Sequence, residues 1–190
     1  MPATKDISSH VILVNEQDTE IGIAEKLAAH QQGLLHRAFS IFILRTHPQK
    51  EVELLLQQRA STKYHSPDLW TNTCCSHPSP GEPLLQAAKR RLKEEFNLAI
   101  PELHDIGQFS YLAHFSNGLI ENELDHVLIG RYNDEAFTPN PEEIQAYRWV
   151  TLADLKKEIA QKPEQFTPWL EKALEIVGTK GLKLAEGFVE

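Results

Sequence analysis

Two short runs of reactive side chains constrain this chain more than any other feature of its sequence. Cys75 and His77 lie two residues apart in the run TNTCCSHP, and Glu121 and Glu123 lie two residues apart in the run GLIENE. In an extended strand, residues i and i+2 point to the same face. Each pair can therefore look into one pocket. If the two pairs meet there, a thiol, an imidazole and two carboxylates form a metal site beside an acid/base pair.

The composition predicts one globular domain over residues 1–190. Hydrophobic residues make up 41% of the 190 residues and charged residues 24%, which suits a chain with a full core. We expect only the ends, residues 1–9 and 178–190, to be loosely ordered. The formal net charge of −8 argues against a nucleic-acid partner but leaves room for a local basic cluster that binds an anionic substrate.

The cysteines and the chain start predict a cytoplasmic protein. The two cysteines are adjacent, and a disulfide between neighbours is strained, so both thiols are expected to be reduced. The first ten residues contain no apolar signal core, and no stretch approaches the roughly 20 apolar residues of a membrane span. We expect a monomer without a membrane or nucleic-acid partner.

Hydrophobic periodicity predicts an α+β chain in the order strands, helix, strands, helices, which suits a three-layer arrangement. Strands are expected at residues 10–15, 38–45, 51–58, 107–115, 123–132 and 146–150, and helices at 83–96, 152–159 and 168–177. A turn at 46–50 would join the second and third strands into a hairpin. Residues 23–32 fit either a helical turn or a loop. In the main helix, Pro83 suits the first turn and Asn97 the left-handed residue at the end.

The main helix carries a run of charged residues, which by itself is typical of a solvated helix face. The segment also resembles a Nudix box, in which a loop and helix present glutamates to a metal–diphosphate. Counted from Ser76, the matching residues are Glu82, Arg90, Leu92, Glu94, Glu95 and Leu98. Ser76 and Asn97 stand where the box has glycine, and Arg91 where it has glutamate. The missing glutamate argues against pyrophosphate hydrolysis.

Four runs together resemble the type I isopentenyl-diphosphate isomerases. They are Glu25-Lys26 with His30 and HRAFS at 36–40, TNTCCSHP at 71–78, GLIENE at 118–123 and FTPW at 166–169. They occur in the family's order with similar spacing, and the resemblance extends from about Val11 to Trp169. It implies a Nudix-like α/β/α sandwich with a mixed β-sheet.

The resemblance implies that the chain interconverts isopentenyl diphosphate and dimethylallyl diphosphate. One proton is added at the terminal alkene carbon and another is removed from the neighbouring methylene, so two groups on opposite faces are needed. By similarity these are Cys75 and Glu123, with Tyr111 beside Glu123. We favour Glu123 with Tyr111 as the donor and the Cys75 thiolate as the acceptor, and the sequence leaves the reverse assignment open. Cys74 is expected to be a small buried hydrophobe.

The resemblance also implies two metal ions. The first is a divalent ion, Mn²⁺, Zn²⁺ or Mg²⁺, in a site of three imidazoles and two carboxylates. Its implied ligands are His30, His36, His77, Glu121 and Glu123. The second is Mg²⁺, which would arrive with the substrate diphosphate and contact Glu95.

Further residues are implied in substrate binding. Lys26, Arg59, Lys63 and Arg91 occupy the positions that bind the diphosphate, and Trp169 the position that covers the isoprenyl end. Taken singly, each cation fits a solvated surface residue and Trp169 a core aromatic. His47, His65, His104, His114 and His126 are interpreted as ordinary surface or core histidines.

Two other functions compete with the isomerase. A Nudix pyrophosphohydrolase would need neither Cys75 nor the histidine set, and would require a glutamate at Arg91. A metal-binding or interaction module without catalysis would not need the Cys75 thiol and the Glu121 and Glu123 carboxylates at the particular spacings found here.

Overall fold

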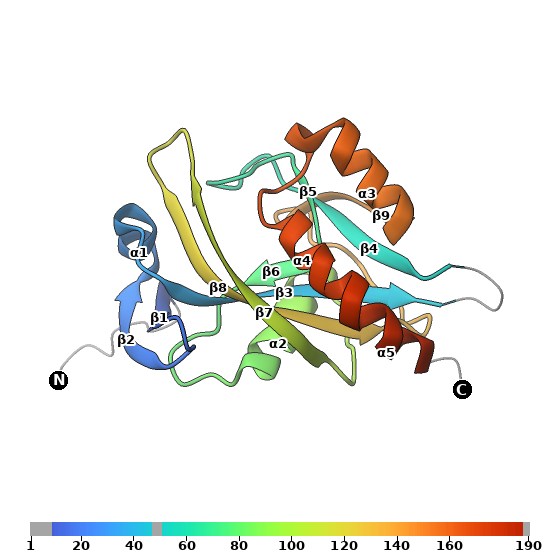
Figure 1. Ribbon diagram of the computed structural model, residues 1–190, viewed down its shortest axis with the longest axis horizontal. Helices are drawn as coiled ribbons and strands as arrows, with labels where there is room; N and C mark the ends of the chain where they lie inside the picture. The colour runs from blue at the N-terminus through green and yellow to red at the C-terminus, as the bar shows by residue number, and fades with distance from the viewer. Residues whose placement is uncertain (1–8, 47–50, 188–190) are drawn as a thin grey trace.

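The computed structural model describes residues 9–46 and 51–187 of the chain (Figure 1). Within these residues it contains a nine-stranded sheet with helices on both faces. The strands are β1 (His10–Val14), β2 (Glu20–Glu25), β3 (His36–Arg45), β4 (Glu53–Arg59), β5 (Trp70–Thr71), β6 (Cys74–Ser76), β7 (His104–His114), β8 (Ile120–Arg131) and β9 (Ile144–Thr151). The helices are α1 (Lys26–Gln32), α2 (Leu84–Phe96), α3 (Leu152–Gln161), α4 (Leu170–Ile176) and α5 (Leu182–Glu186).

Strand β3 organises the sheet. It pairs antiparallel with β1, β4 and β6, and parallel with β8. The hairpin partner β7 extends the sheet from β8, while β9 and β5 pair with β4 and β2 pairs with β1. The sheet is therefore mixed, as predicted.

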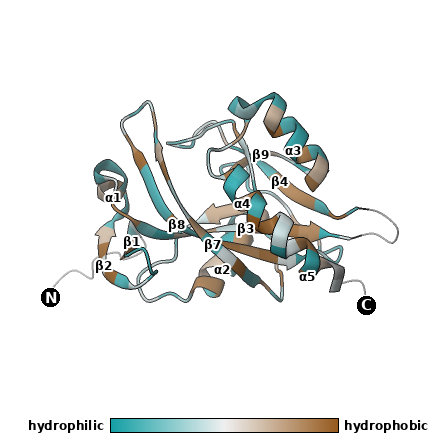
Figure 2. Cartoon of the chain, viewed as in Figure 1, coloured by the Kyte–Doolittle hydropathy of each residue, from teal (hydrophilic) through white to brown (hydrophobic). Residues whose placement is uncertain are grey.

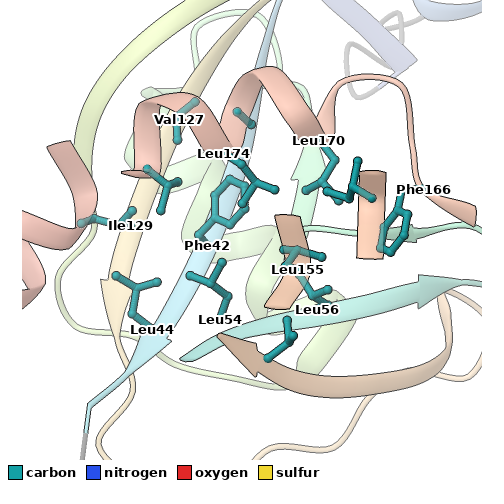
Figure 3. Close-up of a cluster of buried hydrophobic side chains, with 14 of the residues drawn as sticks. Phe42, Leu44, Leu54, Leu56, Val127, Ile129, Leu155, Phe166, Leu170 and Leu174 are labelled. Atoms are coloured by element: carbon teal, nitrogen blue, oxygen red, sulfur yellow. The ribbon is translucent and has the colours of Figure 1, made fainter. Parts of the chain in front are cut away.

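The two faces of the sheet are each covered by helices. Successive side chains of a strand point to opposite faces, so Phe39, Ile41 and Ile43 of β3 pack with α2, while Phe42 and Leu44 pack with α3 and α4. Figure 3 shows the second cluster, with Phe42 between the sheet and Leu174. Both hydrophilic and hydrophobic residues lie along α3 in Figure 2, as expected for a helix with one face on the sheet. The three-layer α+β architecture confirms the predicted fold class.

The predicted elements are largely confirmed, with extensions at their ends. Helix α2 starts after Pro83 and ends at Asn97, whose φ of 51° is left-handed as predicted. Residues 26–32, predicted as helix or loop, form α1, and Ile23 belongs instead to the unpredicted strand β2. The predicted hairpin is paired only where Leu44 and Arg45 meet β4. Its predicted turn falls mainly on residues 47–50, outside the described residues.

The C-terminal segment differs from the loose tail expected for residues 178–190. Residues 177–181 form a π-helical turn that runs into α5, and Ala185 is fully buried in the cluster that α4 covers. Burial of Val177, Gly181 and Ala185 at a spacing of four anchors this segment. The expectation for residues 1–9 lies, except for Ser9, outside the described residues. No helix among the described residues has the length and apolar character that crossing a membrane requires.

An ionic cluster ties the β1–β2 turn to the sheet. His126 of β8 has Nδ1 2.7 Å from Asp105 Oδ2 and Nε2 2.9 Å from Asp18 Oδ2, and Arg37 Nε donates to Asp18 Oδ1 at 2.7 Å. Burial lowers the pKa of His126, but the hydrogen bonds and charges of Asp105 and then Asp18 outweigh it and raise the pKa above its usual value. Because β2 leads directly into α1, this cluster also fixes the helix that carries His30.

Replacing His126 with Gln should reduce stability most at low pH. The raised native pKa means that the ion pairs contribute fully below the unfolded pKa of about 6.5 and are lost as pH rises through the native pKa. We expect a loss of about 1–2 kcal/mol at pH 5.5, and a smaller loss at pH 9, in the free energy of unfolding by urea. The exposed His114→Gln variant is the control. An equal loss at both pH values would contradict this role.

Candidate active site

One cavity collects most of the side chains singled out in the sequence. It opens between the α1 end of the sheet, the β7–β8 hairpin and the loop after β4. Its lining includes all four expected diphosphate-binding cations, the expected catalytic residues and part of the expected metal site. These lining residues are Lys26, Arg59, Lys63, Cys75, His77, Arg91, Tyr111, Glu121, Glu123 and Trp169. Each i, i+2 pair faces one cavity, as the spacing predicts, and the fold brings both pairs, and with them Cys75 and Glu123, to the same cavity.

Five candidate metal ligands converge from four parts of the chain. His30 comes from α1, His36 from β3, His77 follows β6, and Glu121 and Glu123 come from β8. One ligand atom of each lies within 4.8 Å of all the others. His77 Nε2 lies 2.7 Å from Glu123 Oε1 and 3.2 Å from His36 Nε2, and His30 Nε2 lies 3.1 Å from Glu121 Oε1. Glu95, the sixth expected metal ligand, is not part of this cluster.

The Nδ1 protons of His30 and His36 are directed away from the cluster. His30 Nδ1 lies 2.6 Å from the Lys26 carbonyl oxygen, and His36 Nδ1 lies 2.8 Å from the Leu34 carbonyl oxygen. Each carbonyl can only accept, so each Nδ1 carries the proton, and the Nε2 of a neutral ring then presents a lone pair. The imidazole lone pairs and the carboxylate oxygens of the cluster therefore face one another with too few protons between them, an arrangement that a cation can satisfy. Histidines that bind metals typically donate their other ring N–H to a backbone carbonyl, as His30 and His36 do. The cluster could hold a divalent metal ion.

Glu123 is an ionised carboxylate in this arrangement. Burial alone would raise the pKa of Glu123, but the neighbouring His36, and the hydrogen bond that Tyr111 donates to it, lower the pKa to about 2. The Tyr111 hydroxyl lies 2.6 Å from Glu123 Oε2 and 3.0 Å from Glu121 Oε2. Tyr111 thus lies beside Glu123 as the sequence resemblance implied, and it orients both carboxylates.

Cys75 carries its proton in this environment. Burial raises the pKa of the Cys75 thiol to about 12, against the opposing effect of Arg59. Arg59 Nη1 lies 3.9 Å from Cys75 Sγ. The adjacent Cys74 is fully buried in the α2 core, which agrees with its predicted role as a small hydrophobe.

Four cations line the cavity, and two of them, Lys63 and Arg91, already have anionic neighbours. Lys63 Nζ forms an ion pair with Glu143 Oε2, and Arg91 Nη2 lies 2.5 Å from Glu95 Oε1 and 3.6 Å from Glu143 Oε1. Arg91 Nη1 also bonds Glu94 at 2.5 Å. Glu95 is buried behind Arg91, where it accepts from Gln57 rather than lining the cavity.

Trp169 closes the apolar side of the cavity. Its indole nitrogen donates to Asn72 Oδ1 at 3.1 Å, and only 2% of the residue is exposed. The Tyr111 ring lies 6.0 Å away and the Arg59 guanidinium 5.7 Å from the indole centre. A fixed indole face next to the thiol and carboxylate can cover a hydrocarbon chain and favour positive charge on it.

Four lining residues of the cavity were not among the site residues expected from the sequence: Phe39, Tyr64, His65 and Ser76. His65, interpreted as an ordinary surface or core histidine, is buried, and its Nε2 lies 3.1 Å from Glu121 Oε1. The available signal for His65 was its place in the loop between Arg59 and Trp70, two residues after Lys63.

Of the other histidines given that interpretation, His104, His114 and His126 lie outside the cavity lining. His126 is structural, as described above. His47 lies outside the described residues.

The fold is shared with known Nudix proteins. The NUDIX domain family matches residues 34–170 of this chain. A crystal structure of a Deinococcus radiodurans protein superposes with a TM-score of 0.70 at 21% identity, covering 87% of this chain and 97% of that one. A MutT protein from Methanosarcina mazei superposes with a TM-score of 0.57 at 19% identity, covering 74% and 91%.

Curated relatives are far more similar in sequence. The isopentenyl-diphosphate Delta-isomerase of Photobacterium profundum is 48% identical over 90% of this chain and 95% of its own length. The isopentenyl-diphosphate Delta-isomerase 1 of Aromatoleum aromaticum is 47% identical over 90% and 93%. With this identity over nearly the whole of each chain, and with a NUDIX domain at its centre, the chain belongs to the isopentenyl-diphosphate Delta-isomerase family.

Proposed function

We propose that this chain interconverts isopentenyl diphosphate and dimethylallyl diphosphate. The observation that carries the proposal is the opening of the Cys75 thiol and the Glu123 carboxylate into one cavity, with cations on one side and Trp169 on another. Moving the double bond requires a proton at the terminal carbon and loss of a proton from the methylene next to the tertiary carbon. An unactivated alkene is a weak base, so a positioned donor and acceptor and a cavity that excludes water are both needed.

Cys75 and Glu123 are the two proton-transfer groups of this proposal. Their charge states in the cavity, a protonated thiol and an ionised carboxylate, fit donation by Cys75 and acceptance by Glu123. This order is the reverse of the one favoured from the sequence. Tyr111 orients Glu123 through its short hydrogen bond, and the Trp169 indole faces the cationic tertiary carbon.

The metal ion of the proposal is held by the five-ligand cluster. His30, His36, His77, Glu121 and Glu123 suit Mn²⁺, Zn²⁺ or Mg²⁺, since imidazole suits Zn²⁺ and carboxylate suits Mn²⁺ and Mg²⁺. When bound, the ion supplies positive charge that fixes the direction of the Glu123 carboxylate. A second ion, Mg²⁺, accompanies the diphosphate and contacts Glu95, which lies beside Arg91.

The diphosphate binds the cationic side of the cavity. Lys26, Arg59, Lys63 and Arg91 line this side, and guanidinium forks suit phosphate oxygens. A hydrolytic Nudix box would gather several carboxylates around its ions, whereas Arg91 stands in place of one of them and Glu82 is paired with Arg90. We also propose that the enzyme works as a monomer. We propose a cytoplasmic location as well, which the free thiols of both cysteines support.

Incubating the purified protein with isopentenyl diphosphate and a divalent metal tests the activity directly. We expect dimethylallyl diphosphate without free phosphate, because the proposed steps move only protons. Phosphate release would indicate a pyrophosphohydrolase, and neither product would indicate a binding module.

Replacing Cys75 with Ala should lower kcat by a factor of about 10² to 10⁴, because one proton-transfer group is lost. Circular dichroism and metal content should stay unchanged. The control is Cys74→Ala, the same substitution one residue earlier on the core side of β6, which should keep its kcat. A Cys75→Ala enzyme with normal kcat would remove the thiol from the mechanism.

Replacing His77 with Ala should abolish metal content and activity together, because His77 Nε2 lies 3.2 Å from His36 Nε2 and 2.7 Å from Glu123 Oε1. Metal analysis and activity assays of the same preparation are the measurement, with the exposed His114→Ala as the control. A His77→Ala protein that is active without metal would rule out the proposed centre.

Replacing Arg91 with Ala should raise KM for isopentenyl diphosphate about 10- to 100-fold, because charge-assisted hydrogen bonds to the diphosphate are lost. The inhibition constant of inorganic pyrophosphate should rise by a similar factor. Lys93→Ala removes the same charge from the exposed side of α2 and should leave both constants unchanged. Unchanged constants in Arg91→Ala would exclude Arg91 from the diphosphate site.

A further inference from the structure

His65 lies against the candidate metal centre without belonging to it. Its Nε2 is 3.1 Å from Glu121 Oε1, yet it is not one of the five residues whose ligand atoms converge. The residue is 91% buried, by its relative exposure of 9%, and comes from the loop after β4. The mechanism proposed above assigns it no role.

The hydrogen-bond partners decide which ring nitrogen of His65 carries the proton. Nδ1 is buried and has no hydrogen-bond partner, whereas Nε2 faces a carboxylate oxygen. A proton on Nδ1 would leave a buried N–H unsatisfied and set a lone pair against the carboxylate, which is unfavourable on both counts. Nε2 therefore carries the proton, and it lies 3.1 Å from Glu121 Oε1.

Glu121 needs such a donor when the cluster holds an ion. His30 Nδ1 is turned to the Lys26 carbonyl, so in a neutral His30 the Nε2 next to Glu121 Oε1 carries a lone pair. His30 then serves the ion and gives Oε1 no proton. The Tyr111 hydroxyl contacts the other oxygen, Oε2. Within the described residues, His65 is the group at Oε1 that can supply an N–H.

The ring of His65 is held from several sides. It stacks on Phe115 with centroids 5.3 Å apart and meets the edge of Trp169 at 6.0 Å. The Arg59 guanidinium donates to the His65 carbonyl oxygen at 3.1 Å, which fixes the backbone. Because packing already fixes the His65 ring, the ring can orient the Glu121 carboxylate without a further loss of side-chain freedom.

We propose that His65 is a positioning residue of the metal centre, whose Nε2–H fixes the Glu121 carboxylate for metal binding. Partners of metal ligands outside the coordination sphere commonly change metal affinity by a factor of 10 to 100. The inference rests on the proposed metal centre. It predicts an effect on metal affinity in the absence of any substrate.

Mn²⁺ binding to the purified full-length protein without substrate, measured from the electron paramagnetic resonance signal of free Mn²⁺, tests the inference. His65→Phe keeps a ring between Phe115 and Trp169 but removes the donor, and should weaken Mn²⁺ binding about 10- to 100-fold. His65→Gln places an amide N–H near the position of Nε2 and should restore most of the affinity. His114→Phe, an exposed histidine, is the control and should match the unmodified protein.

If the His65→Phe variant does not fold, His65→Met replaces it in the comparison with His65→Gln. Met and Gln have side chains of similar length, but only Gln has an N–H donor. The His65→Met protein should bind Mn²⁺ as weakly as is expected of the His65→Phe protein. Equal affinities for Gln and Met, or an unchanged affinity in both Phe and Met, would overturn the role of His65 while leaving the metal centre intact. Absence of Mn²⁺ binding in the unmodified protein would instead overturn the metal centre, and the inference with it.

Discussion

The register of strand β3 against its neighbours is the constraint on which the site depends. In the parallel pairing with β8, His36 lies opposite Glu123, and in the antiparallel pairing with β6, Ser40 lies opposite Cys75. On the other side of β8, Tyr111 lies opposite Glu123. A slip of one residue would turn each of these side chains to the other face of the sheet. The buried clusters on both faces oppose such a slip, so the core that stabilises the fold also fixes the relative positions of thiol, imidazole and carboxylate.

The site separates its charges in space. Acceptor atoms gather at the end of the sheet next to α1, where the carbonyl oxygens of Lys26 and Leu34 accept the protons of His30 and His36. Three of the four cations gather where α2, β4 and the following loop meet, while Lys26 comes from the start of α1. A substrate with a charged head and an apolar tail can therefore bind in one orientation, with its tail beneath Trp169. The ends of the cavity come from segments far apart in the sequence, so the relation between them is a property of the fold.

The sequence predicted the parts of the structure that follow a regular period. The i, i+2 spacing predicted that Cys75 and His77 would share a pocket and that Glu121 and Glu123 would share a pocket, and apolar periodicity with Asn97 predicted α2 and its end. Strands β5 and β6 have two and three residues, too few for a period to be recognised. The C-terminal helix was missed because Gly178 and Gly181 interrupt the pattern of a helix former, although packing of Val177 and Ala185 compensates for them.

His65 shows a different limit of sequence reasoning. It lies in a loop without period, and its closeness to Glu121 depends on how that loop folds over the sheet. The loop is held by its own backbone carbonyls, through the bonds that Arg59 donates to His65 and Ser66. Such contacts leave no regular spacing in the sequence. Resemblance identified the residues shared with a family, whereas the neighbours of those residues required coordinates.

The ion pairs of Lys63 and Arg91 give the cavity an internal counter-ion. Glu143 contacts both cations, and its backbone carbonyl also accepts from Ala60 at the start of the loop that carries Lys63. In the proposed function, a diphosphate that binds these cations would replace the Glu143 carboxylate as their partner. Its affinity would then be a difference between two sets of contacts, which would make weakly charged anions poor competitors. The same exchange would release Glu143 from Lys63 and so remove one attachment of the loop that carries Lys63.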